Sequence, residues 1–209
     1  LKDEGNRMIT NLYGYNDKYI VASVVNADGS IITGDEILDK CAYASFEENS
    51  TWSRWSLTGG TSYNTNSSVT GNRSFNLSTS STFSRTLNTA KAYTLSFWAT
   101  TSGVTLSSGT TLVKSAPTIN GFTYYEYDIA QGTSSISFSG TSTIDELRLY
   151  PKTARMRSIT YDPIIGKTSE CDENNRITYY DYDNLGRLKF IKDANRNVVK
   201  MYEYNNVSA

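Results

Sequence analysis

The chain has 209 residues, of which 20 are basic and 21 acidic, so its formal net charge is −1. Such a balance provides no excess positive charge for binding nucleic acid or an acidic membrane surface, and no apolar run approaches the roughly 20 residues of a membrane span. Tyrosine is abundant, with 16 copies, and there are only three prolines. Together with frequent Ser and Thr, this composition favours strands over helices.

The first 40 residues contain one clear strand pattern. Tyr19–Val25 is apolar and β-branched, and residues 26–29 (Asn-Ala-Asp-Gly) form a turn signal after it. Ile31–Lys40 is expected to form either a short helix or an irregular link. Residues 1–20 show no basic segment followed by an apolar one, so they do not predict a signal peptide. Because the chain also lacks an initial Met, we expect it to be a piece of a longer protein.

Residues 41–151 are rich in Ser and Thr and contain short alternating segments separated by Gly and Asn. In Ala92–Ala99 the odd-numbered side chains are apolar, whereas Trp98 lies on the other face. Phe122–Ile129, Ser135–Ser139 and Ile144–Tyr150 are further strand patterns. Many short strands at near-regular spacing predict an antiparallel β-sandwich over this region.

Residues 152–209 carry an internal repeat. Tyr161-Asp162 recurs as Tyr182-Asp183, and Asp172 recurs as Asp193, in both cases 21 residues later. A repeat of about 20 residues indicates stacked supersecondary units that cannot bury an apolar face alone. Period-2 alternation predicts that the tyrosines are cross-strand partners in a sheet. Asp183 and Asp193 flank turns and are expected to hydrogen-bond their own backbone.

The repeat resembles the YD repeats of the RHS (rearrangement hotspot) family. The residues that carry the resemblance are Tyr180, Tyr182, Asp183, Gly186, Arg187, Leu188, Ile191, Asp193, Asn195, Val198, Val199, Tyr202 and Tyr204. The family usually has Gly at the second turn, where this chain has Asn195 and Asn197; Asn also tolerates a positive φ.

Residues 13–16 (Tyr-Gly-Tyr-Asn) are similar to a motif that precedes inserted domains in RHS proteins of Bacteroidetes-type bacteria. The resemblance implies a secreted or cell-surface bacterial protein. In this family the repeats build a large β-shell, often around a C-terminal toxin. No toxin domain is visible in the sequence, so that role would belong to the parent protein.

A second resemblance covers residues 41–151. It is carried by four segments in order: residues 44–47 (Ala-Ser-Phe-Glu), Trp52 or Trp55, Tyr93–Ala99 and Ile144–Leu149. Their order and spacing are similar to those of jelly-roll carbohydrate-binding modules. The resemblances together imply an all-β chain, with an N-terminal segment and linker at 1–40, an antiparallel jelly-roll β-sandwich at 41–151 and YD-repeat β-hairpins at 152–209.

The chain contains no histidine, which excludes a Ser-His-Asp or Cys-His site within it. It also has no Walker loop, Gly-x-Gly-x-x-Gly or Cys-x-x-Cys motif. Glycoside hydrolysis by two carboxylates needs no histidine. The acids available for it are Glu47, Glu48, Glu126, Asp128, Asp145 and Glu146. Because these acids lie in the strand patterns of a small module, we expect no enzymatic activity.

Asp145 shares strand parity with Leu147 and Leu149, so it is expected to point into the sandwich. A buried carboxylate is costly unless it is paired or metal-bound, and calcium takes carboxylate and carbonyl oxygens. In the modules that this chain resembles, a Glu after the first-strand Phe and the Asp of the last strand bind a structural calcium ion, which here implies Glu47 and Asp145. The alternative is that Asp145 lies half solvated at the strand end and accepts backbone N–H groups.

Glycan binding needs exposed aromatic rings that stack on sugar faces. The rings singled out for this role are Trp98, Tyr125, Trp55 and Tyr63, with Trp52 and Tyr124 as further candidates. Trp98 stands out for stacking because it opposes the apolar face of its strand. Each ring could instead be a packing residue: Trp98 could pack under a loop or against the neighbouring domain, and Trp52 or Trp55 could close one end of the core. The two cysteines, Cys41 and Cys171, form either a long-range disulfide or two free thiols.

The sequence therefore predicts a non-catalytic segment of a secreted or cell-surface RHS/YD-repeat protein, whose sandwich is a glycan-binding or adhesion module. Its partners would be a carbohydrate ligand and the remainder of the parent protein. One alternative is a purely structural sandwich without a ligand of its own. The other alternative is a glycosidase fragment.

Overall fold

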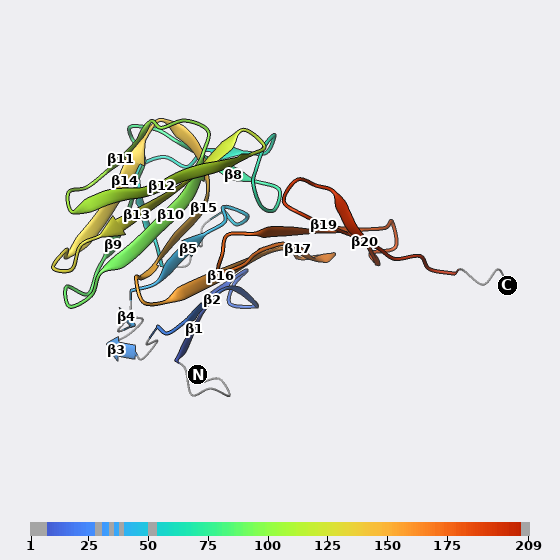
Figure 1. The fold of residues 1–209 in the computed structure, drawn as a ribbon, viewed down its shortest axis with the longest axis horizontal. Coiled ribbons are helices and arrows are strands. Elements are labelled where there is room, and N and C mark those ends of the chain that lie inside the picture. Colours follow the sequence, from blue (N-terminus) through green and yellow to red (C-terminus); the bar gives the residue numbers. More distant parts are fainter. Residues whose placement is uncertain (1–7, 28–30, 34–35, 38–39, 50–53, 206–209) are drawn as a thin grey trace.

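The computed structural model describes residues 8–27, 31–33, 36–37, 40–49 and 54–205. Within these ranges the protein is all-β and contains no helix, as the composition predicted; its strands form three antiparallel sheets and one two-stranded ladder (Figure 1). The ladder pairs β3 (Ile31–Thr33) with β4 (Glu36–Ile37). The short helix considered for Ile31–Lys40 is therefore wrong where the structure describes that segment.

One seven-stranded sheet, called here the repeat sheet, joins both ends of the chain. In spatial order its strands are β1 (Ile9–Gly14), β2 (Tyr19–Val25), β16 (Arg155–Asp162), β17 (Gly166–Cys171), β18 (Ile177–Tyr182), β19 (Leu188–Lys192) and β20 (Val198–Met201). Ala22–Val25 of β2 pairs with Arg155–Ser158 of β16. The residues between these two segments are thus inserted between neighbouring strands. The N-terminal segment, expected as a separate region, supplies two strands of the same sheet as the repeats.

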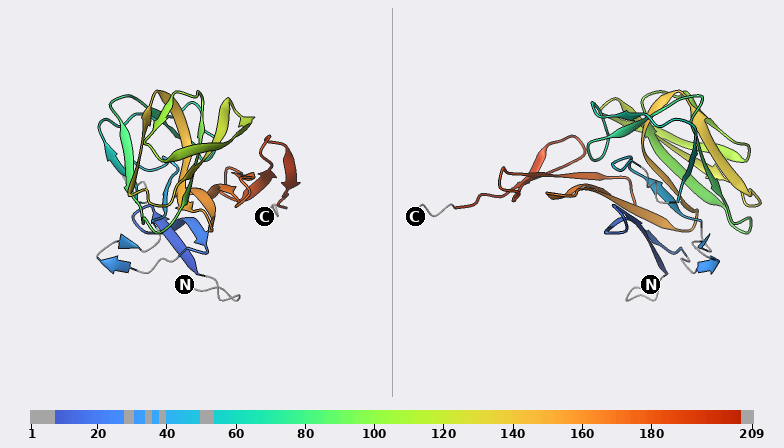
Figure 2. Two further views of the ribbon diagram at one scale, coloured as in Figure 1. Left: turned by 60° about the vertical axis from the view of Figure 1, so that its left-hand side comes forward. Right: turned by 180° about the vertical axis from the view of Figure 1, so that it is seen from behind.

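The inserted residues form a sandwich of two facing sheets (Figures 1 and 2). In spatial order the larger sheet contains β12 (Thr110–Ile119), β13 (Phe122–Ile129), β10 (Tyr93–Ala99), β15 (Ser142–Pro151), β8 (Ser74–Leu77) and β7 (Tyr63–Asn64), with β5 (Ala42–Ala44) also pairing with β15. The smaller sheet contains β11 (Val104–Leu106), β14 (Ser135–Gly140), β9 (Thr82–Thr86) and β6 (Ser56–Thr58). The strands predicted at Phe122–Ile129 and Tyr19–Val25 have the expected bounds.

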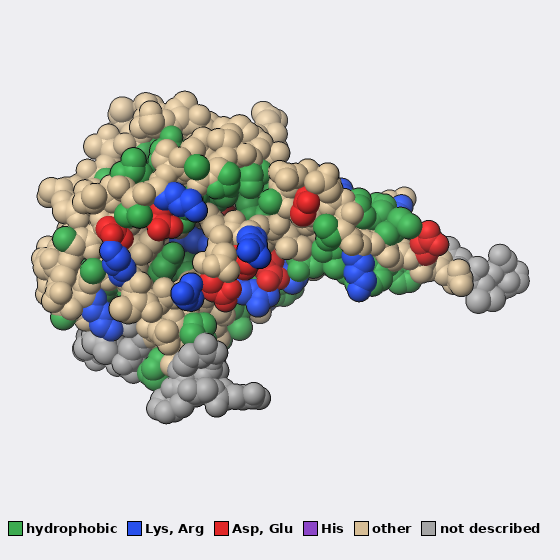
Figure 3. Space-filling view, viewed as in Figure 1, with side chains coloured by type: hydrophobic (Ala, Val, Ile, Leu, Met, Phe, Trp, Pro, Cys, Tyr) green, Lys and Arg blue, Asp and Glu red, His purple; other side chains and the backbone are tan. Residues whose placement is uncertain are grey.

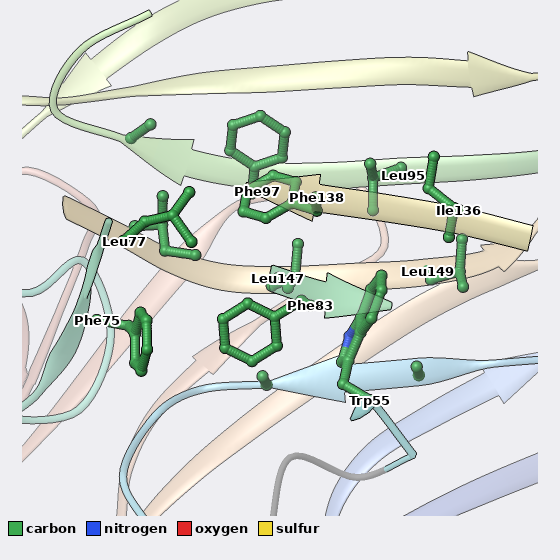
Figure 4. Packing of buried hydrophobic residues seen from close by; sticks show 14 of the residues in the cluster. Trp55, Phe75, Leu77, Phe83, Leu95, Phe97, Ile136, Phe138, Leu147 and Leu149 are labelled. Atoms are coloured by element: carbon green, nitrogen blue, oxygen red, sulfur yellow. The ribbon is translucent and has the colours of Figure 1, made fainter. Parts of the chain in front are cut away.

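The core of the sandwich lies between these two sheets. Tyr93, Leu95, Phe97 and Ala99 point into it from β10, as their alternation predicted. Phe138 meets Phe97 edge to face from the opposite sheet, with ring centroids 4.8 Å apart. Figure 4 shows Phe75, Phe83 and Trp55 closing one side of this cluster. Burial of these side chains is the main favourable contribution to the fold of the inserted domain.

Three turns of the repeat sheet have the same hydrogen-bond pattern. Asp172, Asp183 and Asp193 each accept, through Oδ1, the backbone N–H groups of the residues two and four positions later. In each turn the residue three positions after the aspartate (Asn175, Gly186 or Arg196) donates its N–H to the carbonyl of that aspartate. The expectation that the aspartates hydrogen-bond their own turns is confirmed.

The left-handed position in the last of these turns is occupied by Arg196, whose φ is 65°. The expectation that Asn195 or Asn197 replaces the family's Gly at that position is therefore wrong, because neither has a positive φ in the described backbone. The guanidinium of Arg196 lies over the ring of Tyr179, 3.4 Å from its centroid. This contact offsets part of the cost of a non-Gly residue in the left-handed region.

The repeat sheet extends beyond the sandwich as an arm that ends in β19 and β20 (Figures 1 and 2). All four residues of β20 are exposed. Leu185 and Val199 are 72% and 63% exposed, and Figure 3 shows hydrophobic side chains along this arm. In β16 and β17, at the sandwich end of the sheet, side chains such as Ser158 and Cys171 are instead buried.

Candidate functional site

The outer face of β10 is covered by the repeat sheet. Trp98 is 0% exposed and packs in a cluster that contains Val69, Tyr124 and Tyr179. Its ring is therefore not available for stacking on a sugar, and the prediction of an exposed stacking ring is wrong for this residue. The cause is the neighbouring sheet, which occupies the surface that Trp98 would otherwise present.

Trp55 is also buried, at 6% exposure, and meets Phe83 edge to face in the sandwich core. It is a core residue, so its predicted stacking role is wrong as well. Tyr124 is buried, and its hydroxyl donates to Glu126 at 2.7 Å. Trp52 lies outside the described residues.

Tyr63 and Tyr125 keep part of their surface exposed. Tyr125 stacks on Phe97, with centroids 5.5 Å apart and an interplanar angle of 21°. Tyr63 lies between Phe75, at a centroid distance of 5.8 Å, and the guanidinium of Arg73, at 4.3 Å. One face of each ring thus belongs to the packing of the sandwich, and a glycan contact by either ring stays a prediction.

A β-bulge in β15 changes the direction of Asp145. Ser96 pairs with Arg148 and Trp98 pairs with Asp145, so one residue of β10 stands opposite two of β15. Glu146, one of these two, has φ of 54°. As a result Asp145 faces outward beside Trp98, and the prediction that it points into the sandwich with Leu147 is wrong.

Outside the sandwich, Asp145 holds the backbone of residues 69–73, called here the clamped loop. Its Oδ2 accepts the N–H groups of Val69 and Thr70 at 2.7 and 3.0 Å, and its Oδ1 accepts the N–H of Glu146 at 2.8 Å. Asp145 is 0% exposed. Backbone N–H groups thus satisfy its buried carboxylate. The alternative prediction, that Asp145 accepts backbone N–H groups, is correct, but its expectation of a half-solvated side chain is wrong.

Glu47 holds the other end of the clamped loop. Its Oε1 accepts the N–H groups of Asn72 and Arg73 at 2.9 and 2.8 Å. Between the two carboxylates, the N–H of Gly71 donates to Ser169 Oγ of the repeat sheet at 3.1 Å. Gly71 has φ of 56°, and a Cβ there would lie 2.4 Å from the Glu47 carboxyl group, so a side chain at this position would displace the clamp.

Glu146 forms a buried polar network that connects the sandwich to the repeat sheet. Its Oε1 accepts the hydroxyls of Tyr43 at 2.5 Å and Thr70 at 2.7 Å. Its Oε2 accepts the hydroxyl of Ser158 at 2.6 Å and forms an ion pair with Arg148 at 2.9 Å. Both charged side chains are almost fully buried. Such a pair is costly to break, because removing one partner leaves an uncompensated charge out of water.

Burial raises the pKa values of two acids at this junction, Glu47 and Asp145. Burial raises the pKa of Glu47 to about 7, against the opposing effect of the N–H groups of Arg73 and Asn72. Burial and then the nearby Glu146 carboxylate raise the pKa of Asp145, while the N–H groups of Thr70 and Val69 oppose that shift. Three acids thus meet at the junction, each held by donors from the clamped loop.

One carboxylate oxygen of Glu47 and one of Asp145 are occupied by N–H groups of the clamped loop, and a structural calcium ion held by these two residues stays a prediction. Glu47 Oε1 and Asp145 Oδ2 each accept two of these N–H groups. In the described part of the chain, no group of three or more acidic or cysteine side chains is arranged to hold a metal ion.

The remaining acids and the cysteines have structural contacts. Asp128 pairs with Lys152, and Glu48 accepts the N–H of Tyr15 at 2.5 Å. Cys41 and Cys171 are both buried, lie in different clusters and are not joined by a disulfide, which answers the question of their pairing.

Sequence reasoning missed Tyr43, Thr70, Arg148 and Ser158 as partners of Glu146. The available signal was the pair of adjacent acids at 145–146 with Arg148 in an otherwise apolar strand. In a regular strand successive side chains point to opposite faces, so two adjacent charged side chains cannot both point outward. Such a pair therefore indicates a bulge or a buried ion pair.

Comparison with known proteins adds no identification, since no protein-family model matches the chain and no curated protein is significantly similar to it. Across the described residues no helix has the length and apolar character needed to cross a membrane.

Proposed function

We propose that this chain is a non-enzymatic segment of a secreted or cell-surface RHS/YD-repeat protein, in which a jelly-roll sandwich is a rigid structural insert in the repeat sheet. The observation that carries the proposal is the pairing of β2 with β16 across the whole insert. A domain inserted between neighbouring strands leaves the sheet continuous, which suits an array of repeats that stacks unit on unit.

The contacts at the junction support a rigid rather than a tethered insert. The Glu146 network includes Tyr43 and Arg148 from the insert and Ser158 from the repeat sheet. Tyr179 of the repeat sheet donates to the carbonyl of Val69 at 2.7 Å. Because these polar groups are buried, movement of the sandwich away from the sheet would expose or unpair them at a cost of about 1–3 kcal/mol each.

A cysteine pair tests the continuity on which this role depends. Ser23 and Arg157 are direct partners on β2 and β16, and directly opposite residues of an antiparallel pair lie within reach of a disulfide. The variant with Ser23→Cys and Arg157→Cys is expected to form an intramolecular disulfide on mild oxidation, detected by non-reducing electrophoresis and mass spectrometry. The control with Ser23→Cys and Lys200→Cys, on β20, is expected to stay reduced within one chain. Failure of the first pair to link would contradict the continuous sheet.

Glycan binding by the sandwich is the second candidate function, and the partly exposed rings of Tyr63 and Tyr125 favour it. Binding to an immobilised polysaccharide panel that is lost in Tyr125→Ala and kept in Tyr204→Ala, on the distant arm, would support it. Absence of binding across the panel leaves the structural role as the better account. Hydrolysis of a chromogenic glycoside by the purified chain would contradict both.

A further inference from the structure

A groove of about 520 Å³ opens where the repeat sheet meets the sandwich. Its walls come from the turn between β1 and β2, the loop after β5, residues 72–73 before β8 and the turn after β16. A volume of this size is typical of small-molecule sites, roughly 300–1,000 Å³. Among its described lining residues, none is one of the four rings that the sequence singled out for stacking.

The turn between β1 and β2 has a strained backbone. Tyr15, Asn16 and Asp17 have positive φ values of 53°, 56° and 62°. L-residues adopt this left-handed conformation singly rather than in succession, and each costs free energy. Strain of this kind persists only where the surrounding structure maintains it, and it is concentrated at functional sites.

The contacts that maintain this turn also form the groove. The N–H of Tyr15 donates to Glu48 Oε2 at 2.5 Å. The Tyr15 hydroxyl donates to the carbonyl of Tyr161 at 2.7 Å and accepts its N–H at 3.2 Å. A Cβ at Gly14 would lie 2.4 Å from Glu48 Oε1, so a side chain at this position would displace the Glu48 carboxylate. The strained turn is thus tied to both opposite walls of the groove.

One wall is a cluster of three partly exposed tyrosine rings. Tyr19 stacks on Tyr161, with centroids 4.7 Å apart and an interplanar angle of 24°. Tyr15 meets Tyr19 and Tyr161 edge to face, at 5.5 and 6.1 Å. The mutual packing holds the rings in fixed positions, so little side-chain entropy would be lost when a ligand lies on them.

The remaining lining is polar and carries both signs of charge. Glu47, Glu48 and Asp162 provide carboxyl groups, Lys18 and Arg73 provide cations, and the remaining polar side chains are asparagine amides. The mixture of charges disfavours a strongly charged ligand. Because Pro163 is the one non-aromatic apolar residue among the described lining, the groove also disfavours a lipid chain. Carboxylates and amides beside aromatic rings suit a ligand with hydroxyl groups around an apolar face.

We infer that this groove binds a neutral saccharide. Its pyranose face lies on the tyrosine cluster, and its hydroxyl groups bond to Glu48 and Asp162. This site goes beyond the proposed structural role and does not depend on it, nor on Tyr63 and Tyr125 of the sandwich.

The test uses the whole chain in calorimetric titrations and saturation-transfer NMR. The neutral probes are cellotetraose, maltotetraose and N-acetyllactosamine; the charged probes are hexalysine and a heparin disaccharide. Saturable binding of at least one neutral probe is expected. Tyr19→Ala should weaken that binding roughly tenfold, because it removes a ring of the wall. Tyr19→Phe, which keeps the ring, and Tyr204→Ala, on the arm, should retain it.

Asp162→Asn provides a second, conservative variant. Asn retains the Oδ1 that accepts the N–H groups of Ile164 and Ile165, so the turn is expected to fold while the carboxylate is lost and saccharide affinity falls. Three results would overturn the inference: no saturable binding of the neutral probes, binding of the charged probes alone, or unchanged affinity in both folded variants. None of these results alters the β2–β16 cross-link that tests the structural role.

Discussion

Glu47 accepts two backbone N–H groups of the clamped loop while lying largely out of water. The pKa of about 7 that results differs from the value of about 4.3 expected in an unfolded chain. Between these two values the folded state binds more protons than the unfolded state. The free energy of unfolding therefore falls as pH rises through this window and levels off above about pH 7, as far as this group is concerned.

Glu47→Gln tests whether the free energy of unfolding falls as pH rises. Glutamine does not titrate, but its carbonyl oxygen can still accept the N–H groups of Asn72 and Arg73. We expect urea denaturation between pH 4.5 and 8 to give a flatter pH profile for the variant, with the difference changing by at most about 1.4 kcal/mol per pH unit. Parallel profiles for the two proteins would contradict the raised pKa.

At the scale of single elements, the Asp-capped turns were predictable and their left-handed residues were not. An aspartate before a turn predicts its own hydrogen bonds to the residues that follow, and Asp172, Asp183 and Asp193 all make them. The residue with positive φ stands three positions after each aspartate, but its type differs: it is Asn175, Gly186 or Arg196. At Arg196 a contact with the ring of Tyr179 compensates for the strain. That contact joins separate strands and is not visible in the local sequence.

Substitutions at Arg196 separate the backbone strain from the ring contact. Arg196→Gly removes the strain and the contact together, so its stability should stay within about 1 kcal/mol of the parent. Arg196→Ala keeps the strain and loses the contact, so it should unfold more easily than both, by about 1 kcal/mol relative to Gly. Thermal and urea unfolding measure the order. An alanine variant as stable as the glycine variant would argue against strain at this position.

The alternation of apolar and polar residues predicts which side chains of a strand face the core, and it fails at Asp145. Parity correctly places Leu95 and Phe97 in the core, because β10 is regular. The same rule fails at Asp145, because the bulge at Glu146 inserts one residue and reverses the faces before it. Because of that reversal, Asp145, one of the two predicted calcium ligands, lies outside the sandwich and accepts N–H groups of the clamped loop.

At the scale of the molecule, the junction depends on contacts between residues far apart in the chain. Pairing of Ala22 with Ser158, or of Tyr43 with Glu146, leaves no periodic signal in the sequence. The sequence therefore predicted the sandwich and the hairpins separately, while their joint sheet and the burial of Trp98 between them required the three-dimensional structure.

Arg148→Met tests how strongly the junction holds. It leaves Glu146 buried without its cation, at an expected cost of about 3–5 kcal/mol in the free energy of unfolding. Adding Glu146→Gln removes the unpaired charge and keeps acceptors for Tyr43 and Thr70, so the double variant should recover much of that loss. Urea unfolding of the two variants and the parent measures both steps. A single variant within 1 kcal/mol of the parent, or a double variant no better than the single one, would contradict a buried ion pair at this site.

The pairing of β2 with β16 also determines how the protein bears tension. A pull along the chain enters the inserted domain through one of these strands and leaves it through the other. As long as their ladder is closed, the load passes directly from strand to strand and the sandwich carries none of it. When this chain is stretched, its hairpins and this ladder would therefore open first, and the inserted domain would experience the force only after they had opened.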